Sequence, residues 1–268
     1  MVLFEGRGSS PFRAMTIPWD FWLIFAVLGI LIPWRGAVRV RRLLAMPEVA
    51  PMDRLTIYAS TIAFQWLLAA VVAWRCYARG VSAEDLGLII RTPAKTAVVT
   101  AILLLFFGLL QYAGIRRMAA QDPSSASHLR QISMRLMPRS SVEAMAFVAL
   151  ATTASLCEEF LFRGFVFAAI VRATSSASSS APMSAGTSVP TSSIVAAVVG
   201  SSILFSLAHL YQGKRGLITT FFLGLLLIGS RIWTGNLVPA IAGHMLVDLM
   251  AGYLAPKYLN RAATEGAR

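Results

Sequence analysis

Ionisable side chains interrupt the long apolar segments of this sequence in three short patterns. One is a Glu-Glu-x-x-x-Arg pattern, one places a histidine four residues after a phenylalanine, and one places an aspartate four residues after a histidine. An ionisable side chain costs roughly 2.5–3.5 kcal/mol at the centre of a lipid bilayer, so such residues are candidates for function. The side chains concerned are Glu158, Glu159, Arg163, His209, His244 and Asp248.

Helical spacing assigns these side chains to faces. Glu159 and Arg163 are four residues apart, so they share a helix face and can pair. Glu158 lies about 100° around the helix from Glu159, so it is the carboxylate left free for chemistry. His244 and Asp248 also share a face. Because polar groups inside lipid need one another or water, we expect all three patterns to meet in one buried polar cavity.

The residue types in this cavity suit the hydrolysis of an amide bond. A glutamate and a histidine around one water form a general-base pair, in which Glu158 takes the water's proton and His209 positions the water or shares the proton. The second histidine, His244, together with Asp248, could stabilise the oxyanion of a tetrahedral intermediate. The predicted chemistry is therefore peptide hydrolysis by activated water, without a covalent intermediate.

Seven apolar segments position these residues. A helix that spans a bilayer needs about 20 predominantly apolar residues, and such runs are too long for barrel strands. One of the seven, 144–171, is long enough for a single tilted helix or for a helix followed by a re-entrant half. The predicted fold is an all-α polytopic membrane helix bundle with seven or eight transmembrane helices. The segments are 17–34, 55–74, 96–115, 144–171, 194–213, 216–233 and 236–255.

Composition supports a membrane protein and argues against nucleic-acid binding. Of the 268 residues, 57% are hydrophobic and 13% are charged, which is about half the charge of a soluble domain. The net charge of +12 comes from cations in the short connections between apolar segments, where they contact anionic lipid headgroups. We therefore expect membrane lipids as partners, no nucleic acid, and a multi-pass protein of a bacterial plasma membrane. Because consecutive connections are all basic, the side of the N-terminus stays open.

Three stretches make the chain similar to a known family. They are CEEFLFRG at 157–164, FSLAH at 205–209 and SRIWTGNLVPAIAGHMLVD at 230–248, with EDLGL at 84–88 as a further feature. On these stretches the chain resembles the CPBP family, which includes type II CAAX prenyl endopeptidases and bacterial bacteriocin-processing or Abi-like membrane proteins.

The resemblance implies a glutamate-type intramembrane protease. It implies that Glu158 is the catalytic glutamate, that His209 is its partner in activating water, and that His244 is an oxyanion-hole residue. Glu159 and Arg163 match the supporting part of the first motif. The implied substrate is a membrane-associated protein or peptide, either prenylated or carrying a leader.

The last position departs from the family pattern, which commonly has Asn where this chain has Asp248. Asn can donate a hydrogen bond to an oxyanion, whereas an ionised Asp can only accept one. Either Asp248 is protonated in a low-dielectric site, or it orients and charges His244. The spacing of four residues favours the second alternative.

Other functions are compatible with the same residue types. Embedded Glu, Asp and His also mark ion pathways, so a transporter or proton relay is one alternative, although no inverted repeat is visible. A catalytically silent immunity or scaffold protein is another. Two histidines with carboxylates could bind zinc, but the H-E-x-x-H pattern is absent and the ligands would come from different motifs. We therefore expect a metal-independent endopeptidase without a cofactor.

The order of the segments predicts three parts of the chain. Residues 1–140 hold N-terminal transmembrane helices and basic loops, 141–256 a catalytic bundle like that of CPBP proteins, and 257–268 a C-terminal tail. Within the second part, the Ser-, Ala- and Pro-rich stretch 174–193 is expected to be a flexible connection.

Two local features are predicted around these parts. The polar and basic stretch 122–139 is expected to form an amphipathic helix on the membrane surface, and Ser140 with Glu143 resembles a capping box that starts the next helix. Arg231, at the end of an apolar segment, is expected to snorkel to the interface.

Overall fold

The described residues form helices and connections only. The computed structural model describes residues 17–120, 128–178 and 189–265, and no β-strand occurs among them. The elements are α1 (Trp19–Ala26), the π-helical η1 (Val27–Leu31), α2 (Ile32–Ala45), α3 (Pro51–Ala78), α4 (Pro93–Ala119), α5 (His128–Leu136), α6 (Ser141–Glu159), the π-helical η3 (Phe160–Val166), α7 (Phe167–Ser178), α8 (Thr191–Ala208), the 3₁₀ turn η4 (Leu210–Gln212), α9 (Gly213–Thr234) and α10 (Val238–Glu265).

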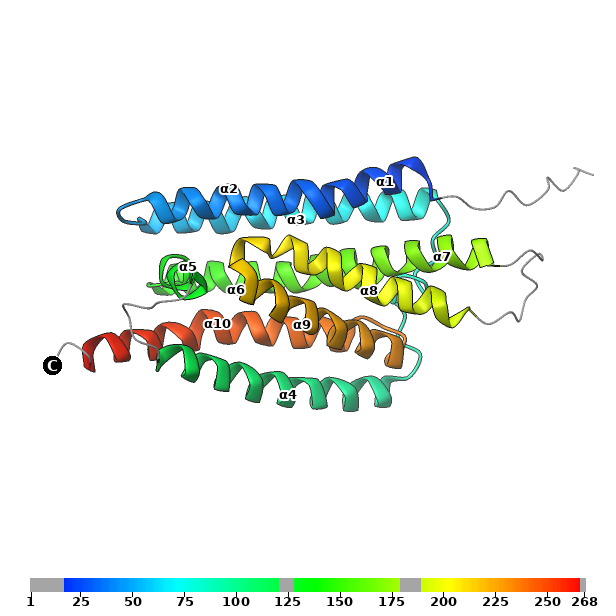
Figure 1. Cartoon of the computed structure of the whole chain (residues 1–268). Helices are drawn as coiled ribbons and strands as arrows, with labels where there is room; N and C mark the ends of the chain where they lie inside the picture. Colours follow the sequence, from blue (N-terminus) through cyan, green and yellow to red (C-terminus); the bar gives the residue numbers. More distant parts are fainter. Residues whose placement is uncertain (1–16, 121–127, 179–188, 266–268) are drawn as a thin grey trace, which may run out of the picture.

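Within this part of the chain, seven helical segments run along the bundle (Figure 1). Two segments are composite, α1–η1–α2 and α6–η3–α7, and the others are α3, α4, α8, α9 and α10. The short α5 lies at one end of the bundle (Figure 1). The helices pack most extensively as α4 with α10, α8 with α9, and α3 with α6. The predicted all-α helix bundle is confirmed.

Exposed apolar side chains mark the surface that meets lipid. By length and composition, five helices among the described residues can cross a membrane, and a shorter apolar helix covers Val238–Leu254. On α4 the exposed side chains Val98, Ile102, Leu105 and Leu109 follow helical spacing, so they form one outward apolar stripe. The helices with spanning character are Trp19–Ala45, Pro51–Ala78, Pro93–Arg117, Thr191–Ala208 and Leu210–Thr234.

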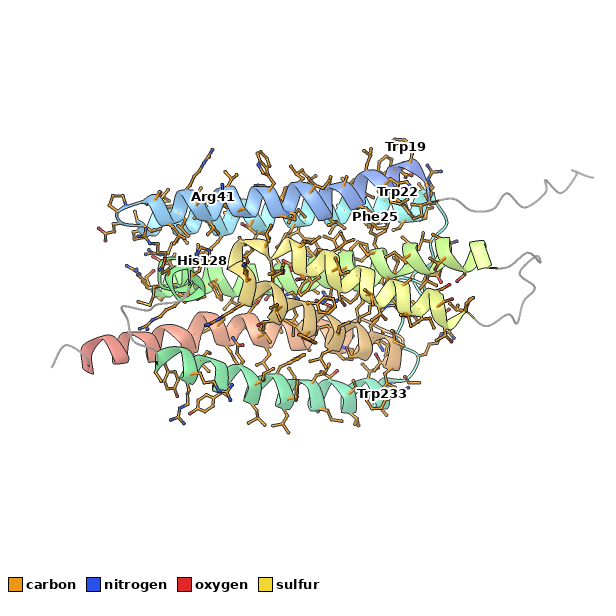
Figure 2. The ribbon with its side chains drawn as sticks, in the orientation of Figure 1. Trp19, Trp22, Phe25, Arg41, His128 and Trp233 are labelled. Atoms are coloured by element: carbon orange, nitrogen blue, oxygen red, sulfur yellow. The ribbon has the colours of Figure 1, made fainter. Side chains whose placement is uncertain are left out.

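Exposed tryptophans gather at one end of the bundle. Figure 2 shows Trp19, Trp22 and Trp233 at one end and Arg41 and His128 at the other. All three tryptophans are exposed, at 69%, 59% and 61%. Exposed tryptophans at the end of an apolar bundle suit the membrane interface, where their rings lie among the headgroups.

The segment that carries the first motif is one long helix. Helical backbone continues without a break from α6 through η3 into α7, which settles the alternative in favour of a single helix. The helix starts at Ser140, whose Oγ accepts from the Glu143 backbone N–H at 3.2 Å, as predicted. The reciprocal half of the box differs, because the Glu143 side chain accepts from the Arg139 N–H at 2.8 Å. The π-helical turn directly follows the paired glutamates; such turns are frequent at functional sites.

Three boundaries differ from the predicted ones. The helix α7 continues to Ser178 and α8 begins at Thr191, so only part of 174–193 is a connection, and residues 179–188 lie outside the described part. The helix α10 runs to Glu265, so most of the expected tail is helical. The predicted amphipathic helix forms over His128–Leu136, whereas 122–127 are outside the description.

Arg231 is buried, which corrects the expectation that it snorkels. Its guanidinium carbon lies 4.4 Å from the centre of the Phe167 ring, and its Nη2 donates to the Asp85 backbone carbonyl. Asp85 belongs to the connection between α3 and α4. In this connection, Gly87 has a φ of +71°, and its backbone carbonyl accepts from the Leu237 N–H at 2.9 Å. The 84–88 motif thus binds both the end of α9, through Arg231, and the residue before α10, Leu237.

A buried ion pair ties the start of α3 to the start of α6. Arg54 Nε lies 2.8 Å from Glu143 Oε2, and the two side chains are 2% and 1% exposed. Arg54 Nη1 also donates to the Val49 carbonyl at 2.6 Å. Close by, the Tyr58 hydroxyl donates to the Leu136 carbonyl. These contacts set the register of α3 against α6, on which the site described below depends.

We expect Arg54→Met to destabilise the protein by about 3–5 kcal/mol, because it leaves the Glu143 carboxylate buried without its cation. Thermal unfolding of purified protein in detergent micelles measures this. Arg91→Met is the matched control, since the Arg91–Glu84 pair is exposed and should matter little. An unchanged unfolding midpoint for Arg54→Met would contradict the structural role of this pair.

Candidate active site

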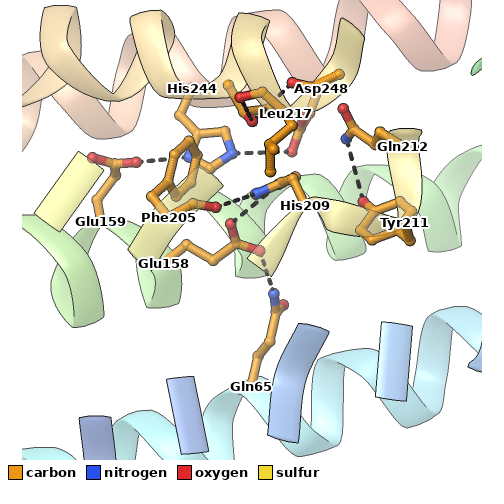
Figure 3. Close-up of polar contacts among 12 residues, drawn as sticks. Gln65, Glu158, Glu159, Phe205, His209, Tyr211, Gln212, Leu217, His244 and Asp248 are labelled. Atoms are coloured by element: carbon orange, nitrogen blue, oxygen red, sulfur yellow. Dashed lines mark hydrogen bonds and ion pairs between the residues drawn. The ribbon is translucent and has the colours of Figure 1, made fainter. Parts of the chain in front are cut away.

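Six predicted site residues come together in the interior of the bundle. Glu158 and Glu159 end α6, Arg163 lies in η3, His209 directly follows α8, and both His244 and Asp248 lie in α10 (Figure 3). They therefore come from three segments of the bundle that are distant in sequence. A further polar side chain, Gln65 from α3, reaches the same place (Figure 3).

Glu158 faces an imidazole and not the surrounding lipid. Its Oε2 lies 3.8 Å from His209 Nε2, and the two side chains are 17% and 14% exposed. This distance is too long for a direct hydrogen bond. A water beside the pair can contact both atoms at once. The other carboxylate oxygen, Oε1, accepts from Gln65 Nε2 at 2.7 Å.

The end of α8 determines how His209 presents its ring. The helix ends at Ala208, and His209 Nδ1 lies 2.9 Å from the Phe205 carbonyl oxygen. A carbonyl oxygen can only accept, so Nδ1 carries the proton. In the neutral ring, Nε2 then has a free lone pair and faces Glu158. The helix terminus thus fixes both the tautomer and the direction of this histidine.

Glu159 anchors a fully buried charge cluster. Its Oε1 lies 2.9 Å from Arg163 Nη1, and both side chains are completely buried, so the predicted pairing of these residues is confirmed. The same oxygen lies 2.8 Å from His244 Nδ1. Adjacent positions of one helix therefore have separate surroundings: Glu159 is bound to a cation and a histidine, whereas Glu158 is directed at His209.

The partner that orients His244 differs from the predicted one. Glu159 contacts His244 Nδ1 at hydrogen-bond distance, whereas Asp248 Oδ2 lies 3.7 Å from Nε2. The spacing of four residues does bring Asp248 beside the ring, but the buried Glu159 from another helix makes the shorter contact. The Asp248 side chain is 33% exposed, compared with 4% for His244. Asp248 thus stands at the accessible edge of the cluster.

Phe205 packs in the middle of the site. Its ring centre lies 4.6 Å from that of His209 and 5.7 Å from that of His244. The guanidinium carbon of Arg163 lies 3.9 Å from the same ring centre. The phenylalanine of the F-x-x-x-H pattern thus has two roles: its ring contacts both histidines, and its backbone carbonyl binds His209.

Sequence reasoning missed Gln65 because an uncharged residue attracts little notice in an apolar segment. The available signal was a strongly polar amide side chain in the middle of the apolar segment 55–74, where every polar group needs a hydrogen-bond partner. Several polar atoms of the site are buried without a hydrogen-bond partner among the described residues. They are Glu158 Oε2, Gln65 Oε1, Glu159 Oε2, Arg163 Nε and Arg163 Nη2.

Comparison with known families places the site in context. Residues 140–250 match the family described as type II CAAX prenyl endopeptidase, Rce1-like. This match supports the resemblance of the segment to the CPBP family. The matched segment contains all six predicted site residues, and Gln65 lies outside it. No curated protein and no solved structure matches the chain significantly. Similarity to this family supports a membrane-embedded endopeptidase that acts on a protein or peptide in a lipid environment.

We expect Glu159→Gln to lower both the stability and the activity of the protein. The amide cannot carry the charge that offsets buried Arg163, so the free energy of unfolding should fall by about 3–5 kcal/mol. His244 also loses its anionic acceptor. Thermal unfolding and cleavage assays measure the two effects, with Glu84→Gln at an exposed ion pair as control. Wild-type values for both in Glu159→Gln would contradict the anchoring role of Glu159.

Proposed function

We propose that this protein is a metal-independent glutamic intramembrane endopeptidase. The observation that carries the proposal is the approach of Glu158 Oε2 to His209 Nε2, at 3.8 Å, in the buried interior of a membrane bundle. A carboxylate and an imidazole that can both contact one water can act together as a general base. His244, in the same cluster, is the group that we assign to the oxyanion of the tetrahedral intermediate.

The first step activates water. Glu158 Oε2 and the unprotonated Nε2 of His209 are both acceptors, so a water between them donates one hydrogen to each and turns its lone pair toward the substrate. Attack on the scissile carbonyl carbon forms the new C–O bond and moves the carbonyl π electrons onto oxygen. The proton released by the water passes to Glu158.

The second step depends on stabilising the negative oxygen. Glu159 holds His244 through Nδ1, so Nε2 is the ring atom available to the pocket. A proton on Nε2, shared with neighbouring Asp248, makes this nitrogen a donor to the oxyanion. Collapse of the tetrahedral intermediate breaks the C–N bond, and the proton held by Glu158 passes to the leaving amine. The products are a carboxylic acid, which keeps the second proton of the water, and an amine, with the Glu158 carboxylate regenerated; transfer of the acid proton to the amine then gives a carboxylate and an ammonium.

The proposed substrate is a membrane-associated protein or peptide. The site lies inside a bundle with lipid-facing apolar surfaces, so a substrate that partitions into the membrane has the shortest route to it. Two chemical classes fit: a prenylated tail, in line with the description of the matched family, and a peptide with a hydrophobic leader. We propose the bacterial plasma membrane as its location and assign no role to nucleic acid.

We expect Glu158→Gln to abolish cleavage while the protein still folds, because the amide has a similar shape but cannot take a proton. Quantitative mass spectrometry of membranes that contain either form tests this. An uncleaved precursor should accumulate with Glu158→Gln and identify the substrate. Identical proteomes would reject the role of Glu158, and proton or solute flux through proteoliposomes that requires Glu158 would favour a transporter.

We expect metal chelation to leave cleavage unchanged. No group of three or more His, Cys, Asp or Glu side chains among residues 17–120, 128–178 and 189–265 is arranged to hold a metal ion. The assay compares cleavage by wild-type membranes before and after treatment with a zinc chelator. Loss of cleavage that added zinc restores would contradict the metal-independent mechanism.

A further inference from the structure

We propose that Gln65 is a positioning residue of this site, which determines the Glu158 oxygen that activates water. The inference deepens the proposed function and rests on it. Gln65 belongs to α3, outside the segment that matches the CPBP family, and its Nε2 donates to Glu158 Oε1 at 2.7 Å. Nothing in the three sequence motifs indicates a contribution from α3.

The contact leaves one carboxylate oxygen for the chemistry. The two oxygens of an ionised carboxylate are equivalent until a donor binds one of them. Gln65 occupies Oε1, whereas Oε2 has no hydrogen-bond partner among the described residues and lies 3.8 Å from His209 Nε2. The bond from Gln65 therefore stops rotation of the carboxylate and keeps Oε2 directed at His209.

The position of Gln65 on α3 shows that an amide is not needed for packing. The face of α3 that is buried in the bundle includes Tyr58, Ala69, Val72 and Cys76, and Gln65 follows the same helical spacing. An apolar side chain would continue this face at no cost in unpaired polar groups. The amide in this apolar row has its hydrogen-bond partner in Glu158 across the interface.

Contacts of the residues next to Gln65 fix its position along α3 relative to Glu158. Trp66 Nε1 donates to Thr153 Oγ1 at 3.2 Å, which fixes α3 on α6 little more than one turn before Glu158. On the other side, the Arg35 guanidinium carbon lies 4.2 Å from the centre of the Phe64 ring. The reach of the Gln65 side chain is therefore set by residues on both sides of it.

The two ends of the Gln65 amide differ in a way that suits an active site. An amide that only joined two helices would have both ends satisfied by protein groups. Here Nε2 binds the proposed catalytic carboxylate, and Oε1 is buried without a partner among the described residues. The charged and titratable groups that interact with Glu158 include Glu159, Arg163, His209, Tyr211, His244 and Asp248.

The decisive variant is Gln65→Leu, which removes the donor and keeps an apolar side chain of similar size. We expect cleavage to fall on the order of 100-fold, the effect of misplacing a catalytic group by about 1 Å, with an unchanged unfolding midpoint. The readout is the ratio of precursor to product in membranes, for every protein whose precursor accumulates with Glu158→Gln. Gln65→Asn keeps the amide but is too short, so it should also lower cleavage. Leu67→Ala, on the exposed face of α3, is the matched control.

A second measurement reports on the carboxylate itself. Infrared difference spectra between purified wild type and Glu158→Gln identify the Glu158 carboxyl band. This band should shift in Gln65→Leu and stay in place in Leu67→Ala, because only the first removes the hydrogen bond to Oε1.

The outcomes separate the two proposals. If Glu158→Gln changes no precursor, the proposed function fails, and the role of Gln65 fails with it. If Glu158→Gln blocks cleavage while Gln65→Leu cleaves like wild type, the role of Gln65 alone is overturned. Reduced cleavage with an unshifted Glu158 band would also overturn it, because Gln65 would then act on a different group.

Discussion

Charge that is buried inside lipid must be matched by charge or hydrogen bonds from elsewhere in the chain, and the rest of this structure depends on that constraint. Lipid offers no solvation to Glu159, Arg163 or His244, and these groups pair with one another across two helices. The cluster requires the α6–η3 helix and α10 to lie in one register, which places the helix that carries Glu158, while the end of α8 places His209 at 3.8 Å from it. The supporting cluster is thus the structural condition for the reactive pair.

Glu158 and Glu159 have different roles because adjacent residues of a helix point about 100° apart. Glu159 is fully buried and pairs with Arg163 and His244, whereas Glu158 is partly accessible and has one oxygen without a hydrogen-bond partner among the described residues. The π-helical turn that follows carries Arg163 back over the Phe205 ring. The arrangement separates the groups that hold the site together from the groups that would act on a substrate.

Most of the fold and the membership of the site could be predicted from sequence, whereas the partners within the site could not. Apolar length and helical spacing indicated the bundle and the Glu159–Arg163 pair, because both depend on local geometry. Asp248 was expected to orient His244 from spacing alone, but Glu159 on another helix makes the shorter contact. Gln65 was missed because it is uncharged, and the burial of Arg231 because its partner, Asp85, lies far away in sequence.

An experimental map that resolves ordered water tests the central claim most directly. The claim is that Glu158, His209 and His244 face one water-containing pocket inside the membrane. A crystal structure in a lipid phase should show a water within hydrogen-bond distance of both Glu158 Oε2 and His209 Nε2, with His244 facing the same space. A Glu158 carboxyl group turned toward lipid, away from both imidazoles, would contradict the account.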